Sequence, residues 1–265
     1  MADNRCFQRT YSAMASRQQL LQALDGLLQP ERFKDHGPNG LQVEGKPALR
    51  RLVSGVTASR ALIEAAIEAR ADAILVHHGL FWRGQDGCIK GWMKQRVALL
   101  LAHDINLFAY HLPLDAHPEL GNNAQLGHQL GLVATGNFGE QALGCLGPRA
   151  DGAGFADTQA LALHLENTLK RSVTSVDGTQ GAIKNIAWCT GGAQGYFEGA
   201  IAAGAQAFIT GEISEPQAHY ARECGVSFLD CGHHASERYG APAVAAHVAA
   251  QLGLEHRFID IDNPA

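Results

Sequence analysis

The chain has 265 residues, of which 46% are hydrophobic and 18% charged, enough to bury one large core or two ordinary ones. Its formal net charge is -5 and no cluster of five or more Lys and Arg occurs, which argues against a surface that follows nucleic-acid phosphates. No run approaches the roughly 18 consecutive apolar residues that span a bilayer, and polar residues stand where a secretory core would lie. We therefore expect a cytoplasmic protein without a membrane segment.

Residues 1–15 show no periodicity and are predicted to be a loose N-terminal extension, within which Met14 is a second candidate for the translation start. The segment that begins at Met14 predicts a helix with Ser16 as its N-cap. The first folded unit is therefore expected to begin at about residue 16.

Residues 16–135 alternate between strand-like and helix-like segments. A strand-like run at 51–56 is followed by a helix-like segment and then by the buried strand DAILV, which ends at His77 and His78. Such a strand, helix, strand unit implies parallel pairing through a right-handed crossover. The alternation continues with a helix over residues 92–103, a strand over 105–110 and a helix over 122–130. We predict a first α/β lobe over 16–135.

The glycine-rich residues 136–184 interrupt this alternation and contain one helix candidate, at 158–169. They are predicted to form an inserted smaller lobe or a cap over the site. The alternation resumes over residues 185–265, which we predict to be a second α/β lobe closed by a long helix and a final strand at 256–261.

An internal repeat links the two halves. Sliding the chain by 134 positions aligns residues 52–79 with 186–213 without a gap, although two Ala-rich helices can also match by chance. The strand that follows favours a true duplication, because a His-x-x-x-acid pattern comes after it in both halves. The sequence therefore predicts two similar α/β lobes related by internal duplication, with the site in the cleft between them.

Histidines and acids gather at the carboxyl ends of the predicted strands, the edge at which parallel α/β sheets bind ligands. Imidazole together with carboxylate suits zinc, iron(II), manganese and cobalt alike. Adjacent histidines on a strand point to opposite sides, which favours two ions over one, and Asp115 and Glu237 are candidates to bridge them. The predicted metal ligands are His77, His78, Asp115, His233 and Glu237. Ions in such a site lower the pKa of bound water, so the implied reaction class is hydrolysis.

Other residues near these motifs allow more than one interpretation. His111 matches His233 in the repeat, and Glu212 stands in the place of His78. Three roles are open to these two residues: a sixth metal ligand, a residue that orients a ligand, or a proton shuttle. The CTGG turn either holds a phosphate on backbone N–H groups or is only a tight turn. Phe81 and Trp82 either stack on a base or, as we favour, pack under a loop. We expect structural or surface roles for eight other histidines: His36, His103, His117, His128, His164, His219, His247 and His256.

The six cysteines form no CxxC pair, and three of them lie in or beside apolar strand-like runs, as Cys189 and Cys231 do. Such thiols pack as small hydrophobic side chains in a reducing compartment. We therefore expect free, buried thiols and no disulfide framework.

Several motifs resemble a known family: VHHGLFW, HLPLDAHPELGNN, WCTGGAQ, ITGEISE and GHHASER, with PNGLQVEG upstream. From about Met14 onward, and least over residues 136–184, the chain resembles the GTP cyclohydrolase I type 2 family. The resemblance implies paired α/β lobes, a dinuclear metal site between them and a toroidal homohexamer with the sites facing its interior. It also implies the same five metal ligands, because each of them lies in one of these motifs.

The resemblance further implies hydrolytic opening of the guanine imidazole ring of GTP, with release of formate on the way to dihydroneopterin triphosphate. We therefore expect a dinuclear metal-dependent hydrolase with a small-molecule substrate such as a nucleotide. Two alternatives stay open. In the first, the protein is a non-catalytic metal-binding ring that binds a partner protein or a nucleic-acid strand. In the second, the metals are purely structural. The acidic charge disfavours the nucleic-acid strand.

Overall fold

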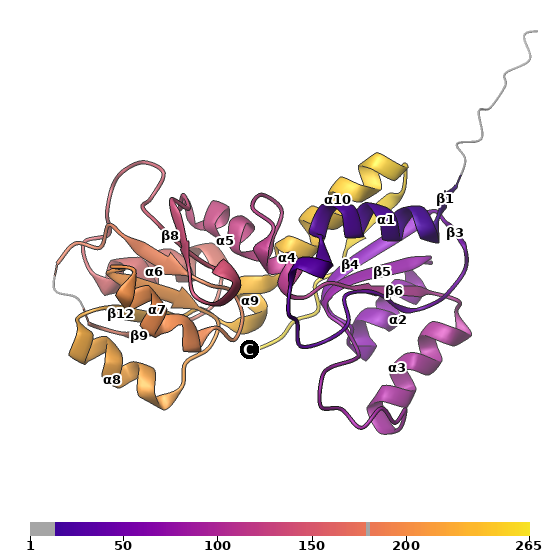
Figure 1. The fold of residues 1–265 in the computed structure, drawn as a ribbon, viewed down its shortest axis with the longest axis horizontal. Coiled ribbons are helices and arrows are strands. Elements are labelled where there is room, and N and C mark those ends of the chain that lie inside the picture. The colour runs from indigo at the N-terminus through magenta and orange to yellow at the C-terminus, as the bar shows by residue number, and fades with distance from the viewer. Residues whose placement is uncertain (1–13, 179–180) are drawn as a thin grey trace, which may run out of the picture.

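The computed structural model describes residues 14–178 and 181–265. Residues 1–13 of the predicted N-terminal extension therefore lie outside the described residues. The chain forms two α/β lobes, each a sheet with helices on both faces (Figure 1). The short helices α4 (Leu112–Ala116) and α9 (His233–Glu237) lie between the two lobes in this view. Within the described residues no helix has the length and hydropathy to cross a bilayer.

The first lobe is built on a five-stranded sheet of order β13-β4-β5-β6-β2, in which β2 alone is antiparallel to its neighbour. Its strands are β2 (Gly40–Val43), β4 (Arg51–Thr57), β5 (Ala73–His78), β6 (Asn106–Ala109) and β13 (Glu255–Phe258). Helices α1 (Arg17–Leu28) and α10 (Gly240–Leu252) cover one face, and α2 (Arg60–Glu68) and α3 (Gly91–Ala102) cover the other. A small ladder of β1 (Ala15–Ser16) with β3 (Ala48–Leu49) and the 3-10 turn η1 (Pro30–Arg32) complete the lobe.

The second lobe is built on a six-stranded sheet of order β7-β8-β10-β11-β12-β9, with a parallel centre and antiparallel edges. Its strands are β7 (Gly136–Phe138), β8 (Gly144–Gly147), β9 (Thr174–Val176), β10 (Ile186–Trp188), β11 (Ala207–Thr210) and β12 (Ser227–Asp230). Helices α5 (Asn122–Leu130) and α6 (Thr158–Leu169) cover one face, and α7 (Phe197–Ala202) and α8 (Glu215–Cys224) cover the other. The 3-10 turns are η2 (Glu140–Ala142) and η3 (Gln194–Tyr196).

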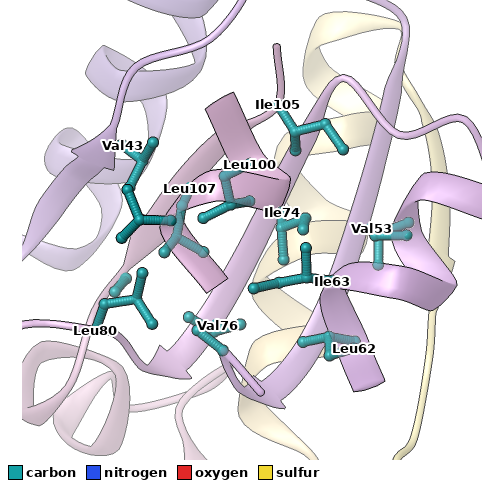
Figure 2. Close-up of a cluster of buried hydrophobic side chains, with 14 of the residues drawn as sticks. Val43, Val53, Leu62, Ile63, Ile74, Val76, Leu80, Leu100, Ile105 and Leu107 are labelled. Carbon is teal, nitrogen blue, oxygen red and sulfur yellow. The ribbon is translucent and has the colours of Figure 1, made fainter. Parts of the chain in front are cut away.

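Local sequence signals explain where the elements begin. The predicted N-cap Ser16 is confirmed: its hydroxyl accepts from Gln19 N at 3.1 Å, and the Gln19 side chain accepts from Ser16 N at 2.8 Å. Strand β5 is apolar throughout because both of its faces are covered. Ile74 and Val76 enter the cluster under α2 and α3 (Figure 2), and Leu75 packs toward α1 and α10.

The structure differs from the predicted lobe boundaries in three places. The final helix and strand, placed in the second lobe over 185–265, return to the first lobe, because β13 pairs with the free edge of β4 and α10 packs beside α1. Residues 136–184 are not a cap: they supply β7, β8 and β9, and α6 covers the same sheet. Helix α5, expected in the first lobe, packs Leu126 and Leu130 into the second.

The internal repeat has a counterpart in the strand register. Leu52 of β4 is paired with Ala73 of β5, and the positions 134 residues later, Ile186 and Ala207, are paired in the same way between β10 and β11. Each pair of strands is parallel and joined by a helix on one face of its sheet. This equivalence supports the duplication as the origin of the two lobes.

Ile74 is fully buried in the core of the first lobe. Truncating its side chain should show how much that core contributes to the free energy of unfolding. We expect Ile74→Ala to lower the free energy of unfolding by about 2–5 kcal/mol and Ile74→Val by about 0.5–1.5 kcal/mol. Leu101→Ala, on the exposed face of α3, is the control and should change it by less than about 0.5 kcal/mol. Urea unfolding measures all three. Equal effects of Ile74→Ala and Leu101→Ala would contradict the packing described for this core.

Candidate metal centre

The site lies beyond the carboxyl ends of parallel strands from both sheets, β5 and β6 in the first lobe and β12 in the second. His77 and His78 end β5, and Asp115 lies in α4, shortly after β6. From the second lobe, α9 begins at His233, separated from the end of β12 by two residues, and ends at Glu237. The fold therefore gathers all five predicted ligands from segments up to 160 positions apart.

Glu237 occupies the centre of this cluster. Its Oε1 lies 3.3 Å from His77 Nε2. Its Oε2 lies 3.3 Å from His78 Nε2 and 3.1 Å from His233 Nε2. Asp115 joins through Oδ1, which is 3.6 Å from His77 Nε2. The cluster is thus a set of imidazole and carboxylate atoms, close enough together to hold a metal ion.

The imidazoles are anchored through their other ring nitrogen. The Nδ1 partners are Tyr110 O for His77 (3.2 Å), Thr57 Oγ1 for His78 (3.2 Å) and Glu212 Oε1 for His233 (2.7 Å). Metal-binding histidines are commonly held in this way, because the Nδ1 contact fixes the ring and leaves Nε2 for the ion. Of the three roles open to Glu212, this contact supports the second, the orientation of a candidate ligand.

Asp115 is held by two side chains of the second lobe. Its Oδ1 accepts from Asn122 Nδ2 at 2.9 Å and from Thr190 Oγ1 at 3.3 Å. These contacts keep the carboxylate fixed across the boundary between the lobes. Sequence reasoning assigned neither side chain a role in the metal site, although both residues lie in motifs that carry the family resemblance.

The buried carboxylates change the proton affinity of two imidazoles. Burial alone lowers the pKa of His77, but the charges of Asp115 and Glu237 outweigh it and raise the pKa to about 9. Burial also opposes a charge on His233, whose pKa is nevertheless raised to about 9 by Glu237 and Glu212. Both rings therefore carry a proton at neutral pH unless another cation replaces it.

His78 and Glu237 are already in the forms that bind metal, whereas burial raises the pKa of the Asp115 carboxyl. Burial lowers the pKa of His78 to about 3, and the charge of His77 adds to the effect, so His78 is neutral. Burial raises the pKa of Glu237, yet the charge of His77 and contact with His233 bring it well below its ordinary value. A neutral imidazole and an ionised carboxylate are what a metal ion requires.

Two buried atoms also favour a cation at this place. His77 Nε2 and Glu237 Oε2 have no hydrogen-bond partner within the described part of the chain, because the short distances between the side chains lack hydrogen-bond alignment. Unpaired buried polar atoms are costly in a folded protein. A divalent ion would satisfy both atoms, so the residues present fit the metal site that the sequence predicts.

Close packing of the chain around the cluster explains the CTGG motif. Gly191 has a φ of +70°, and a side chain there would overlap Glu237 Oε1. The N–H groups of Thr190 and Gly191 already donate to Asn123 and Ser236, so they are not available for a phosphate. The structure therefore agrees with a tight turn at this motif.

His111 and Trp82 lie at the edge of the cluster. The His111 ring is 4.9 Å from that of His77, between centroids, and the Trp82 ring is 5.9 Å from that of His78. Phe81 is partly buried and packs against the core of the first lobe. The eight histidines for which structural or surface roles were expected belong to none of the metal-binding groups found among the described residues.

The family model described as Duf34/NIF3 (NGG1p interacting factor 3) matches residues 15–264. The chain belongs to the Duf34/NIF3 family. Relatives in this family are named GTP cyclohydrolase 1 type 2 homolog, which confirms the resemblance drawn from the motifs. The relative from Pseudomonas aeruginosa is 50% identical over 249 residues, 93% of this chain and 97% of its own. The relative from Allochromatium vinosum is 49% identical over 259 residues, 96% and 99% of the two chains.

Solved structures of Duf34/NIF3-like proteins share the two-lobed fold. The structure titled protein ybgI, unknown function, has a TM-score of 0.90 and 43% identity and covers 95% of this chain and 100% of its own. The protein TTHA1606 from Thermus thermophilus has a TM-score of 0.82 and 32% identity, with the same coverage. The mixed α/β fold class predicted from the sequence is therefore confirmed.

The raised pKa values predict how the metal-free protein responds to pH. A histidine whose pKa rises on folding stabilises the folded state below its ordinary value of 6.5 and loses that contribution as the pH passes through 9. We therefore expect the Tm of chelator-treated protein to fall between pH 6.5 and 9. The Tm of the metal-loaded protein should fall less, because the ion takes over the charge compensation. Parallel pH profiles for the two forms would contradict this.

Gly191→Ala tests whether close packing around Glu237 matters for metal binding. The matched control is Gly131→Ala, where φ is +67° but no atom lies within 4 Å of the added Cβ. Both substitutions should cost about 1–2 kcal/mol for the left-handed backbone. Only Gly191→Ala should also weaken metal binding, by roughly 10-fold or more, because it displaces the carboxylate. Competition with a fluorescent chelator measures the affinity, and similar affinities for both variants would refute the role of Gly191.

Proposed function

We propose that the protein is a dinuclear metal-dependent hydrolase acting on a nucleotide or related small phosphorylated molecule, with GTP as the first substrate to test. The position of Glu237 carries the proposal. Its Oε1 faces His77, and its Oε2 faces His78 and His233. A carboxylate between two groups of imidazoles suits the bridging position of hydrolytic sites whose ions lie about 3.5–4 Å apart.

Glu237 is a better bridge than Asp115, although both were candidates. Asp115 faces one imidazole only, that of His77, and its Oδ1 is already held by Asn122 and Thr190. We therefore assign the two ions to two sets of ligands that share one carboxylate. One set is His77, Asp115 and Glu237, and the other is His78, His233 and Glu237.

Divalent ions at such a site lower the pKa of water and neutralise the negative charge that develops during hydrolysis. The chain orients the metal ligands and determines from which side a substrate reaches the site. Asn122 and Thr190 hold the Asp115 carboxylate, and Glu212 holds the His233 ring. The side chain of His233 is 27% exposed, whereas that of His77 is fully buried, so we expect the substrate to approach from the side of His233.

The substrate class rests on the names of the relatives, GTP cyclohydrolase 1 type 2 homolog, which denote action on a nucleotide. We include in the proposal the toroidal homohexamer implied by the family resemblance, with the sites facing its interior. We assign no phosphate to the CTGG turn, because the Thr190 and Gly191 N–H groups are already engaged.

Turnover by the metal-loaded protein tests the proposal. Protein loaded with Mn(II) or Fe(II) should release formate from GTP, or product from another member of a nucleotide and phosphoester panel. Asp115→Ala and Glu237→Gln should each lower kcat by more than about 100-fold, because each removes a metal ligand and not merely an orienting group. His103→Ala, an exposed imidazole of the first lobe, is the matched control and should keep full activity.

A non-catalytic metal-binding ring is the second candidate. The family description, NGG1p interacting factor 3, supports a role in binding a partner protein. Stoichiometric metal without turnover across the whole panel would favour this alternative over the hydrolase. A purely structural role would instead appear as dissociation or unfolding on chelation, with no activity to lose.

A further inference from the structure

His111 is held in the manner of a metal ligand, although it is not one of the five predicted. Its Nδ1 lies 2.7 Å from Asp35 Oδ1, and its backbone N–H donates to Asn39 Oδ1 at 2.7 Å. Asp35 is itself fixed, because its carboxylate also accepts from Asn39 Nδ2 and from Leu112 N, both at 2.9 Å. The ring is therefore locked from its Nδ1 side, and Nε2 is the nitrogen left for another partner.

The His111 ring adjoins the rings of His77 and His78. A ring nitrogen of His111 lies within 4.8 Å of ring nitrogens of His77 and His78. The ring centroids of His111 and His77 are 4.9 Å apart, and those of His111 and His78 are 5.7 Å apart. The Trp82 ring stands perpendicular to His111 at 5.0 Å and packs against its edge. His111 thus lies closer to His77 than to His78, which favours the ligand set that contains His77.

The two lobes treat the equivalent histidines alike. His233 has Nδ1 2.7 Å from Glu212 and Nε2 3.1 Å from Glu237, four residues later on α9. His111 has Nδ1 2.7 Å from Asp35 and precedes Asp115 by the same four residues, at the start of α4. His111 is the N-cap of α4 and His233 is the first residue of α9, so each histidine stands at the beginning of the short helix that carries the acid four residues later.

We propose that His111 is a sixth protein ligand, on the ion assigned to His77, Asp115 and Glu237, and that Asp35 is the residue that positions it. The inference rests on the proposed dinuclear site and deepens it. That ion then has two imidazoles and two carboxylates, and the other ion has two imidazoles and the shared carboxylate. Asp35 acts through His111 and does not touch the ion.

Proton NMR of the Co(II)-loaded protein tests this directly. Each ligating imidazole held through Nδ1 carries an exchangeable N–H proton that Co(II) shifts far outside the normal range. The protein should give four such signals, one each from His77, His78, His111 and His233. His111→Ala should lose one signal and bind one of the two ions roughly 10–100-fold more weakly. His103→Ala, the matched imidazole deletion, should leave all four signals and both affinities unchanged.

A second variant covers the case in which His111→Ala does not fold. Asp35→Asn keeps a hydrogen-bond acceptor but removes the charge, so all four signals should remain and that of His111 should move. Three signals in the parent protein, unchanged by His111→Ala and with both ions retained, would overturn the role of His111 alone. Failure of the parent protein to bind Co(II) at all would instead overturn the proposed function.

Discussion

A carboxylate removed from water must be faced by positive charge or by hydrogen-bond donors, and Glu237 is such a carboxylate at the centre of this protein. It is only 3% exposed and lies among imidazoles of both lobes. Protons on His77 and His233 compensate its charge in the metal-free chain. Metal ions would compensate the same charge and satisfy the atoms that lack hydrogen bonds. The electrostatic requirement of one side chain therefore links the fold, the pH dependence and the proposed chemistry.

The connection between the lobes brings that carboxylate into position. Helix α9 carries His233 and Glu237, and the chain then runs directly into α10, which packs on the sheet of the first lobe. Asn122 reinforces the junction, because its side chain donates to Asp115 and accepts from the backbone N–H of Gly240 at the start of α10. The return of the C-terminal segment thus explains why ligands of the second lobe lie at the strand ends of the first.

The sequence predicted those features that depend on neighbours along the chain. Helices α5 and α6 begin and end at the expected residues, and Ser16 caps α1. The five candidate ligands meet, because strand ends of parallel sheets share an edge and the repeat marked equivalent positions in both halves. Asp35 escaped prediction, because nothing in a turn-rich stretch indicates that its carboxylate will contact an imidazole 76 positions later.

The sequence by itself determined the elements, their apolar faces and the residues with the chemistry to bind metal, since these follow from periodicity, capping and side-chain type. Only the tertiary structure decided which sheet receives β13, that residues 136–184 extend the second sheet, and that Glu237 rather than Asp115 lies between the imidazoles. The reason is physical. Strand edges pair through backbone groups that every residue carries, and an apolar face does not specify which other apolar face will cover it.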